Sequence, residues 1–168
     1  MAQKFMILDQ GKKKLLEATD SSTGAADAGE VVALNADGLI DPSMLPDQDV
    51  TSIVTFENVT AGDYVNIFDD GGTVKVRLAD NSNDRPAHGF VKDTTVAPAP
   101  VNVFFEGANP NLSGLTEGAR IYLGTTGGVI ETPLDPTNPA DDGKLHQLLG
   151  WAVSDTEVNT DIQDCIEL

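Results

Sequence analysis

The chain has 168 residues, 40% of them apolar, and many Gly, Pro, Asn, Asp and Thr, which favours a turn-rich β protein of one ordinary domain or a small domain with an appendage. Its net charge of −17 argues against nucleic acid and anionic membranes as direct partners, because both would repel it. A single cysteine excludes an internal disulfide and a cysteine-based metal framework, and no stretch is typical of a signal peptide or a membrane span.

The first fourteen residues form a short basic and apolar stretch. They carry Lys4 and Lys12 to Lys14 against Asp9, whereas the remaining 154 residues carry 6 basic and 26 acidic side chains. This asymmetry indicates an arm that tethers the chain to an acidic surface, the alternative being a solvated and partly disordered terminus. The small residues that follow, up to residue 30, have loop character.

Residues 31–50 form a connector with conflicting local signals. Residues 30–34 are typical of a short strand, residues 35–38 of a turn, and Asp41-Pro42 of a helix start that Pro46 ends almost at once. Four apolar residues then lack a local core: Leu39, Ile40, Met44 and Leu45. Leaving them in water forfeits roughly 1.5–3 kcal/mol each, so either the β domain or sister chains should cover them. We favour sister chains, and so a subunit junction.

From residue 51 onward, apolar and polar residues alternate as in half-buried strands. Five groups are expected to share a face within their strand: Val74, Val76 and Leu78; Val101, Val103 and Phe105; Ile121 and Leu123; Leu149, Trp151 and Val153; and Val158, Thr160 and Ile162. The pairs Gly71-Gly72 and Gly127-Gly128 suit tight hairpins that need positive φ. With no helical pattern between the runs, residues 51–168 predict a small antiparallel β-barrel or sandwich.

The residues with catalytic or metal-binding chemistry form no known motif. His88, His146 and Cys165 lack flanking residues that would orient a base or build an oxyanion hole, so we expect neither an enzyme nor a cofactor. Residues 80–84 (DNSND) alternate oxygen ligands, but Arg85 and Val91 occupy the positions where a calcium loop needs Gly and Glu. A polar turn without metal is therefore expected there.

The connector resembles one that recurs in virion proteins of tailed bacteriophages, a short strand followed by (A/S)-(D/S)-G-x-(I/L)-D-x-S-x-L-P. The matching residues are Ala36, Asp37, Gly38, Ile40, Asp41, Ser43, Leu45 and Pro46. Residues 61–153 also resemble the small β-barrel domain of phage head-fibre, capsid decoration and short tail-fibre proteins. The stretches that carry this likeness include GDYVNIFDDGGTVKVRLAD, the Pro86-Ala87-x-Gly89 element, GLTEGARIYLGTTGGVIETP and HQLLGWAVS.

The resemblance implies a homotrimer on the capsid exterior of a virion made in a bacterial cytoplasm, with the major capsid protein as partner. Residues 1–30 would form the docking arm, 31–50 the trimer junction and 51–168 a projecting β-barrel domain. The expected docking residues are Lys4, Phe5, Ile7, Leu8, Lys12, Lys13 and Lys14, and the expected junction residues are Leu39, Ile40, Met44 and Leu45. The chain has no heptad repeat and no Gly-X-Y run, which favours a compact trimer over a long fibre.

The alternative is a short tail fibre or host-recognition module that binds a cell-surface glycan or protein. Its contacts would come from loops such as residues 80–86 or 134–143. A cluster of exposed aromatic residues would favour this reading, but Trp151 and Tyr122 both fall on expected strands.

Overall fold

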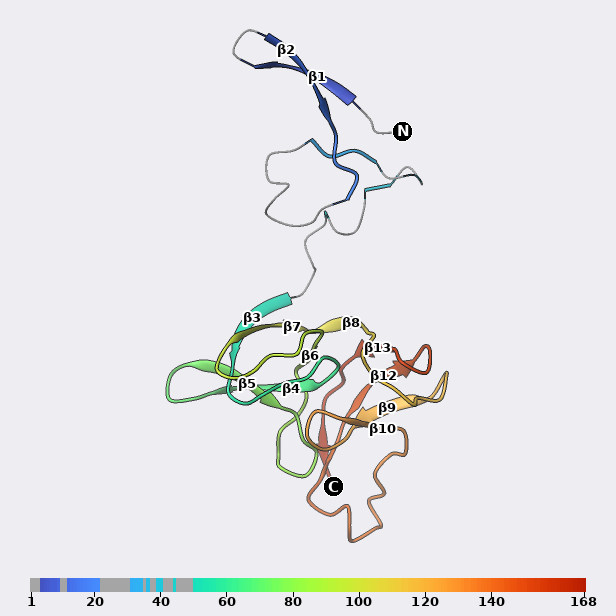
Figure 1. Ribbon diagram of the computed structural model, residues 1–168. Coiled ribbons are helices and arrows are strands. Elements are labelled where there is room, and N and C mark those ends of the chain that lie inside the picture. The colour runs from blue at the N-terminus through green and yellow to red at the C-terminus, as the bar shows by residue number, and fades with distance from the viewer. Residues whose placement is uncertain are drawn as a thin grey trace. The chain divides into compact units, whose positions relative to one another are not determined.

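The computed structural model describes residues 4–9, 12–21, 31–34, 36, 39–40, 44 and 50–168. The chain divides into two compact units, residues 1–48 and 49–168 (Figure 1). The described residues form a mainly β structure without an α-helix, as the composition predicts. None of them belongs to a helix that is long and apolar enough to cross a membrane.

The first unit begins with an antiparallel hairpin of β1 (Lys4–Asp9) and β2 (Lys12–Glu17). Its register runs from Lys4 opposite Glu17 to Asp9 opposite Lys12. Met6 and Leu15 are directly opposed and are 63% and 61% exposed. The sequence analysis assigned no secondary structure to this arm. It overlooked Gly11, which stands between two short apolar and basic runs and is a hairpin signal.

The described residues of the connector form only part of the structure that its sequence predicts. The expected strand over residues 30–34 is a single parallel bridge between Thr19 and Val32, in which the Thr19 N–H donates to the Val31 carbonyl at 2.9 Å. Met44 lies in a 3-10 turn, while residues 41–43 and 45–49, with the rest of the expected helix start, lie outside the described residues. Leu39 and Ile40 are 63% and 47% exposed within the described part.

The second unit begins with a closed five-stranded barrel in the order β3-β5-β4-β6-β7 (Figure 1). Its strands are β3 (Val50–Thr55), β4 (Tyr64–Asp69), β5 (Val74–Leu78), β6 (Gly89–Val91) and β7 (Pro100–Phe104). One prediction needs correction, because β3 and β5 are parallel rather than antiparallel. The cause is topological: β5 returns from the β4 hairpin into the position between β3 and β4.

The remaining strands lie outside the barrel but within the same compact unit of residues 49–168. They form a five-stranded sheet in the order β10-β9-β12-β13-β8 and a two-stranded ladder of β11 and β14. Their bounds are β8 (Glu106–Asn109), β9 (Arg120–Leu123), β10 (Val129–Ile130), β11 (Leu145–His146), β12 (Leu148–Ala152), β13 (Val158–Asp161) and β14 (Ile166–Glu167).

Two clusters of buried side chains stabilise this unit. One fills the barrel with Ile53, Val59, Val65, Val76, Val91, Val101 and Val103. The other joins residues of barrel strands, such as Phe90 and Phe104, to residues of the sheet, such as Leu149 and Val158. The Tyr64 hydroxyl crosses the same boundary, since it shares a hydrogen bond of 2.9 Å with Thr160 Oγ1. Barrel and sheet therefore share one core.

Both predicted glycine hairpins are confirmed. Gly71 and Gly72 have φ of 64° and 93° in the turn between β4 and β5. In the turn between β9 and β10 the positive values fall on Thr126 (49°) and Gly127 (78°), one position earlier than expected. Both turns contain residues with positive φ, as predicted, because each turn reverses the chain within a few residues.

The predicted shared face of Leu149, Trp151 and Val153 is wrong. Leu149 is fully buried, whereas Trp151 and Val153 are exposed. The cause is a β-bulge: Leu148 faces Tyr122 and Gly150 faces Ile121, so Leu149 is an extra residue on β12. The bulge uses Gly150, whose φ is 150° and where a Cβ would collide with the carbonyl of Asn159. Beyond it, Ala152 points inward instead.

Candidate functional site

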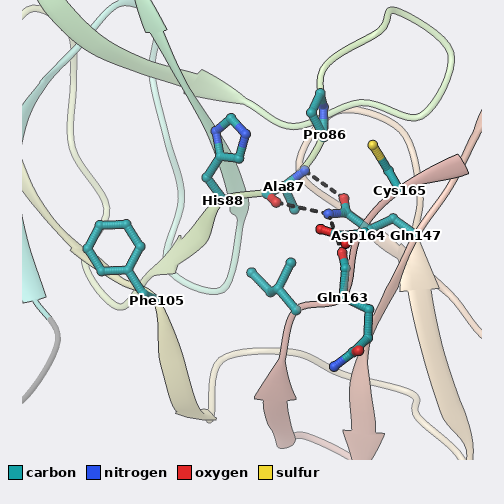
Figure 2. A pocket seen from close by; sticks show the side chains of 9 residues that line it. Pro86, Ala87, His88, Phe105, Gln147, Gln163, Asp164 and Cys165 are labelled. Atoms are coloured by element: carbon teal, nitrogen blue, oxygen red, sulfur yellow. Dashed lines mark hydrogen bonds between the residues drawn. The ribbon is translucent and has the colours of Figure 1, made fainter.

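A pocket of about 380 Å³ opens where the barrel and the C-terminal segment meet (Figure 2). Its lining comes from four places: the segment before β6, Phe105 between β7 and β8, Gln147 between β11 and β12, and the chain after β13. The lining residues are Pro86, Ala87, His88, Phe105, Gln147, Ile162, Gln163, Asp164 and Cys165. The walls combine apolar side chains with an imidazole, a carboxylate and a thiol.

Gln147 forms the base of this pocket and holds its walls together. Its Oε1 accepts the Ala87 N–H at 2.8 Å, and its Nε2 donates to the Ala87 carbonyl at 3.1 Å and the Gln163 carbonyl at 3.0 Å, as Figure 2 shows. The side chain is buried, so each of these bonds replaces contacts with water. The amide of Gln147 thus forms hydrogen bonds within the protein and does not serve as a ligand-binding group.

His88 holds a neutral ring beside the pocket. Its Nδ1 accepts the Ile67 N–H at 2.9 Å. Partial desolvation lowers the pKa of His88 below its ordinary value. Because a backbone N–H can only donate to an unprotonated nitrogen, this bond also favours the neutral form with the proton on Nε2. The ring can offer one N–H donor at neutral pH.

The structure brings His88 and Cys165 to one pocket but joins them by no hydrogen bond. Figure 2 shows the two side chains on either side of Ala87. Cys165 is exposed. His146 lies elsewhere, packed against Tyr122 with the two rings tilted by 34° and their centroids 4.9 Å apart, and its Nδ1 is buried without a hydrogen-bond partner among the described residues. This geometry aligns no base with the thiol.

Residues 80–84 form the polar turn that the sequence predicts. Asp80 Oδ1 accepts the N–H and the hydroxyl of Ser82 at 2.8 and 2.7 Å, and Oδ2 accepts the Thr126 N–H at 3.0 Å. Burial raises the pKa of Asp80, but these hydrogen bonds outweigh it and hold the pKa below its usual value. Within the described residues, no group of three or more His, Cys, Asp or Glu side chains could hold a metal ion.

The loop over residues 131–144 is closed by its own carboxylates. Asp135 Oδ1 accepts the N–H and the hydroxyl of Thr137 at 2.8 and 2.7 Å, which lowers the pKa of Asp135. Asp141 Oδ1 accepts a hydrogen bond from Lys144 Nζ at 2.9 Å, which lowers the pKa of Asp141. The loop is a folded turn whose polar groups bind one another.

The expected docking residues come together on one hairpin. β1 carries Lys4, Phe5, Ile7 and Leu8, and β2 carries Lys12, Lys13 and Lys14. Lys13 and Lys14 are exposed. Of the expected junction residues, Leu39 and Ile40 are exposed, Met44 is half-buried, and Leu45 lies outside the described residues.

The two aromatic residues singled out on strands have opposite environments. Tyr122 is buried beside His146, whereas Trp151 is 39% exposed on β12. Trp151 lies opposite Asn159 of β13 and Arg120 of β9, both exposed. The sequence did not predict this outward Trp, because the bulge at Leu149 reverses its face.

Comparison with known proteins identifies no relative. No known protein family matches the chain, and no curated protein and no solved structure matches it. The resemblance of residues 36–46 to the phage connector therefore stays a prediction.

Proposed function

We propose that the chain is a virion structural protein of a tailed bacteriophage, which decorates the capsid exterior as a homotrimer and binds the major capsid protein. The observation that carries the proposal is the hairpin of β1 and β2, in which Met6 and Leu15 share a face with the exposed Lys13. An exposed surface that combines apolar and basic side chains fits an acidic protein surface. The connector that follows resembles the connector of tailed-bacteriophage virion proteins, which supports the phage assignment.

The β1–β2 hairpin would dock by burying its apolar pair while its lysines meet acidic residues of the shell. Burying a side chain the size of Met6 or Leu15 stabilises by roughly 1.5–3 kcal/mol relative to leaving it in water. One such hairpin gives a modest affinity. Three hairpins on one trimer bind with avidity, because the second and third contacts become intramolecular.

The three subunits of the trimer would contact one another at the connector. Leu39 and Ile40 are exposed within the described residues, and sister chains would bury them. Replacing both by Ser should dissociate the trimer while the second unit stays folded. Light scattering gives the mass, and a mass still at the trimer value would refute this junction.

The docking experiment is co-sedimentation of the full chain with capsids that lack it. We expect the variant with Met6→Ser and Leu15→Ser to stay in the supernatant, because its hairpin has lost the apolar contact. The matched control is Val96→Ser, which changes an equally exposed apolar residue of the second unit. Co-sedimentation of the hairpin variant at the wild-type level would contradict docking through this hairpin.

The alternative function, a tail-fibre or host-recognition module, is supported by one observation, the outward Trp151 between Arg120 and Asn159. A Trp face beside polar side chains can stack on a sugar ring. Imaging virions with and without the protein separates the two functions. Density lost from the head supports decoration, and density lost from the tail supports recognition.

A further inference from the structure

One side of the barrel carries a cluster of aromatic and basic side chains, which we name the cationic face: Val54, Phe56, Phe68, Lys75 and Arg77. Val54 of β3 is paired with Lys75 of β5, which is paired with Phe68 of β4. Phe56 contacts Phe68 edge-on, with ring centroids 5.3 Å apart. Phe56 is 54% exposed.

Arg77 is the residue of this face that has binding capacity to spare. Its guanidinium lies 4.3 Å from the Phe68 ring centroid, and its Nε donates to Asn66 Oδ1 at 2.9 Å. It forms no ion pair with any described carboxylate, whereas Lys75 pairs with Asp70 at 2.7 Å. A stacked guanidinium with free N–H groups is suited to bind a carboxylate in a bidentate manner.

The opposing chemistry lies on the outer side of the sheet, on what we name the acidic face: Glu106, Ala108, Trp151, Asn159 and Asp161. Asp161 of β13 is directly opposite Glu106 of β8, and both are exposed. Neither forms an ion pair with a described residue. Like charges in directly opposed positions destabilise a sheet, so this pair favours a cation from outside.

An apolar surface adjoins that pair. Asn159 and Ala108 form the next outward pair along the two strands, and Trp151 lies opposite Asn159. On the other side of Trp151, the opposite residue is Arg120 of β9. Three strand spacings separate β9 from β8, which carries Glu106, so Arg120 is roughly 14 Å from Glu106 at the usual strand spacing. It therefore leaves the carboxylate pair uncompensated.

We propose that the cationic face of one copy docks on the acidic face of a second copy, with Arg77 and Lys75 against Glu106 and Asp161 and with Phe56 toward Trp151. Charge complementarity selects a second copy as the occupant, because residues 49–168 carry six basic against nineteen acidic side chains and two of the six lie on the cationic face. Exposed Phe, Trp and Arg are also the residues that dominate protein interfaces.

The two faces differ, so the contact is heterologous, and in the proposed homotrimer it would repeat around a closed ring. In Figure 1 the hairpin of β4 and β5 lies on the left of the second unit and β12 and β13 on its right, so the strands that carry the two faces lie apart in this view. The inference rests on the proposed homotrimer and names its lateral surface. Each contact also relieves the repulsion between Glu106 and Asp161.

The first test uses carbodiimide, which joins a lysine directly to a carboxylate. A mixture of unlabelled and nitrogen-15-labelled full chains is cross-linked and digested, and mixed-isotope peptides are identified by mass spectrometry. We expect links from Lys75 to Glu106 or Asp161 between copies. The pair of Lys144 and Asp141, 2.9 Å apart, verifies the reaction within one chain. If that internal link forms and no link joins Lys75 of one copy to Glu106 or Asp161 of another, the contact is refuted.

The second test is a charge exchange followed by sedimentation. Arg77→Glu and Asp161→Arg should each weaken self-association at least tenfold, and the two together in one chain should restore it to within about threefold. Lys144→Glu and Asp142→Arg are the matched controls, and both should leave association unchanged. Phe56→Ser provides a variant without a charge change and should also weaken association. Single variants that associate like the wild type, or a double variant no better than the singles, would overturn the proposal.

Capsid co-sedimentation of the same variants separates this contact from the proposed function. Variants that dissociate yet still bind capsids through the β1–β2 hairpin support both ideas. Wild-type protein that binds capsids as a monomer retains the decoration function and refutes the contact. Wild-type protein that forms the exchange-sensitive oligomer without binding capsids supports the contact and refutes decoration.

Discussion

Among the described residues, the two units of this chain differ in how many apolar side chains they bury. Nineteen of the twenty buried apolar residues among those described lie in residues 49–168, and Ala33 is the only one in the first unit. The described part of the first unit exposes seven large apolar residues: Met6, Leu15, Val31, Val32, Leu34, Leu39 and Ile40. The second unit has a core of its own, whereas the first holds apolar surface that another surface can cover.

This difference separates two kinds of stability. In the second unit a substitution acts on folding, because packed side chains and paired backbone groups surround it. In the first unit we expect the same substitution to act on binding, because most of its described large apolar side chains are exposed.

The largest effect is expected at Gly150. Gly150→Ala places a Cβ against the Asn159 carbonyl at the bulge, so the sheet must shift. We expect a loss of about 4 kcal/mol or more in the free energy of unfolding, measured by urea denaturation. Gly143→Ala is the control, since its φ is 73° but nothing lies within 4 Å of the added Cβ. It should cost about 1–2 kcal/mol. Equal losses of unfolding free energy in the two variants would contradict the bulge.

The next effect compares one substitution in both units. Leu149→Ala empties part of the core shared by barrel and sheet and should cost about 2–5 kcal/mol of unfolding free energy. Leu39→Ala removes an exposed side chain of the first unit and should change the unfolding of the second unit by less than about 0.5 kcal/mol. A comparable loss at Leu39 would break the distinction between the units.

The smallest effect concerns Asp80, whose carboxylate ties the turn of residues 80–85 to the β9–β10 turn. Its pKa is lower in the folded chain than the usual value near 3.9. The bonds to the charged form therefore stabilise fully above about pH 4 and are lost as the pH falls through the folded pKa. Asp80→Asn should cost about 1.5–3 kcal/mol at pH 7.

The pH dependence of the Asp80 effect checks its electrostatic origin. The gap in unfolding free energy between wild type and Asp80→Asn should shrink when denaturation is repeated in acid. Asp142→Asn, an exposed carboxylate, serves as control and should have little effect at either pH. A gap that is independent of pH would show that the carboxylate charge does not contribute.

Local patterns anticipated much of the second unit. The alternation of Val158, Thr160 and Ile162 and the turns at Gly71-Gly72 and Gly127 are confirmed, because both signals depend on neighbours within a few residues. The outward face of Trp151 was missed, because the bulge before it depends on how β12 meets β9. The hairpin of the first unit was missed although Gly11 marks it.

The lining of the pocket could not be predicted from local sequence patterns either. His88 and Cys165 were recognised as reactive residues, but their common location depends on Gln147, which holds the segments of Ala87 and Gln163 together. Two stretches that carry the phage resemblance meet at this bond, Pro86-Ala87-x-Gly89 and HQLLGWAVS. Sixty positions separate Ala87 from Gln147, so no local pattern could have paired them.

The β class, the turns and the contrast between the basic first fourteen residues and the acidic remainder can be predicted from the sequence, since each follows from composition or from spacing within a strand or turn. The tertiary structure decided which strands close the barrel, where the bulge reverses a face and which charges share a surface. The physical reason is that strand order and register depend on long-range pairing and on one shared core. Arg77 beside Phe68, and Asp161 opposite Glu106, arise only from that pairing.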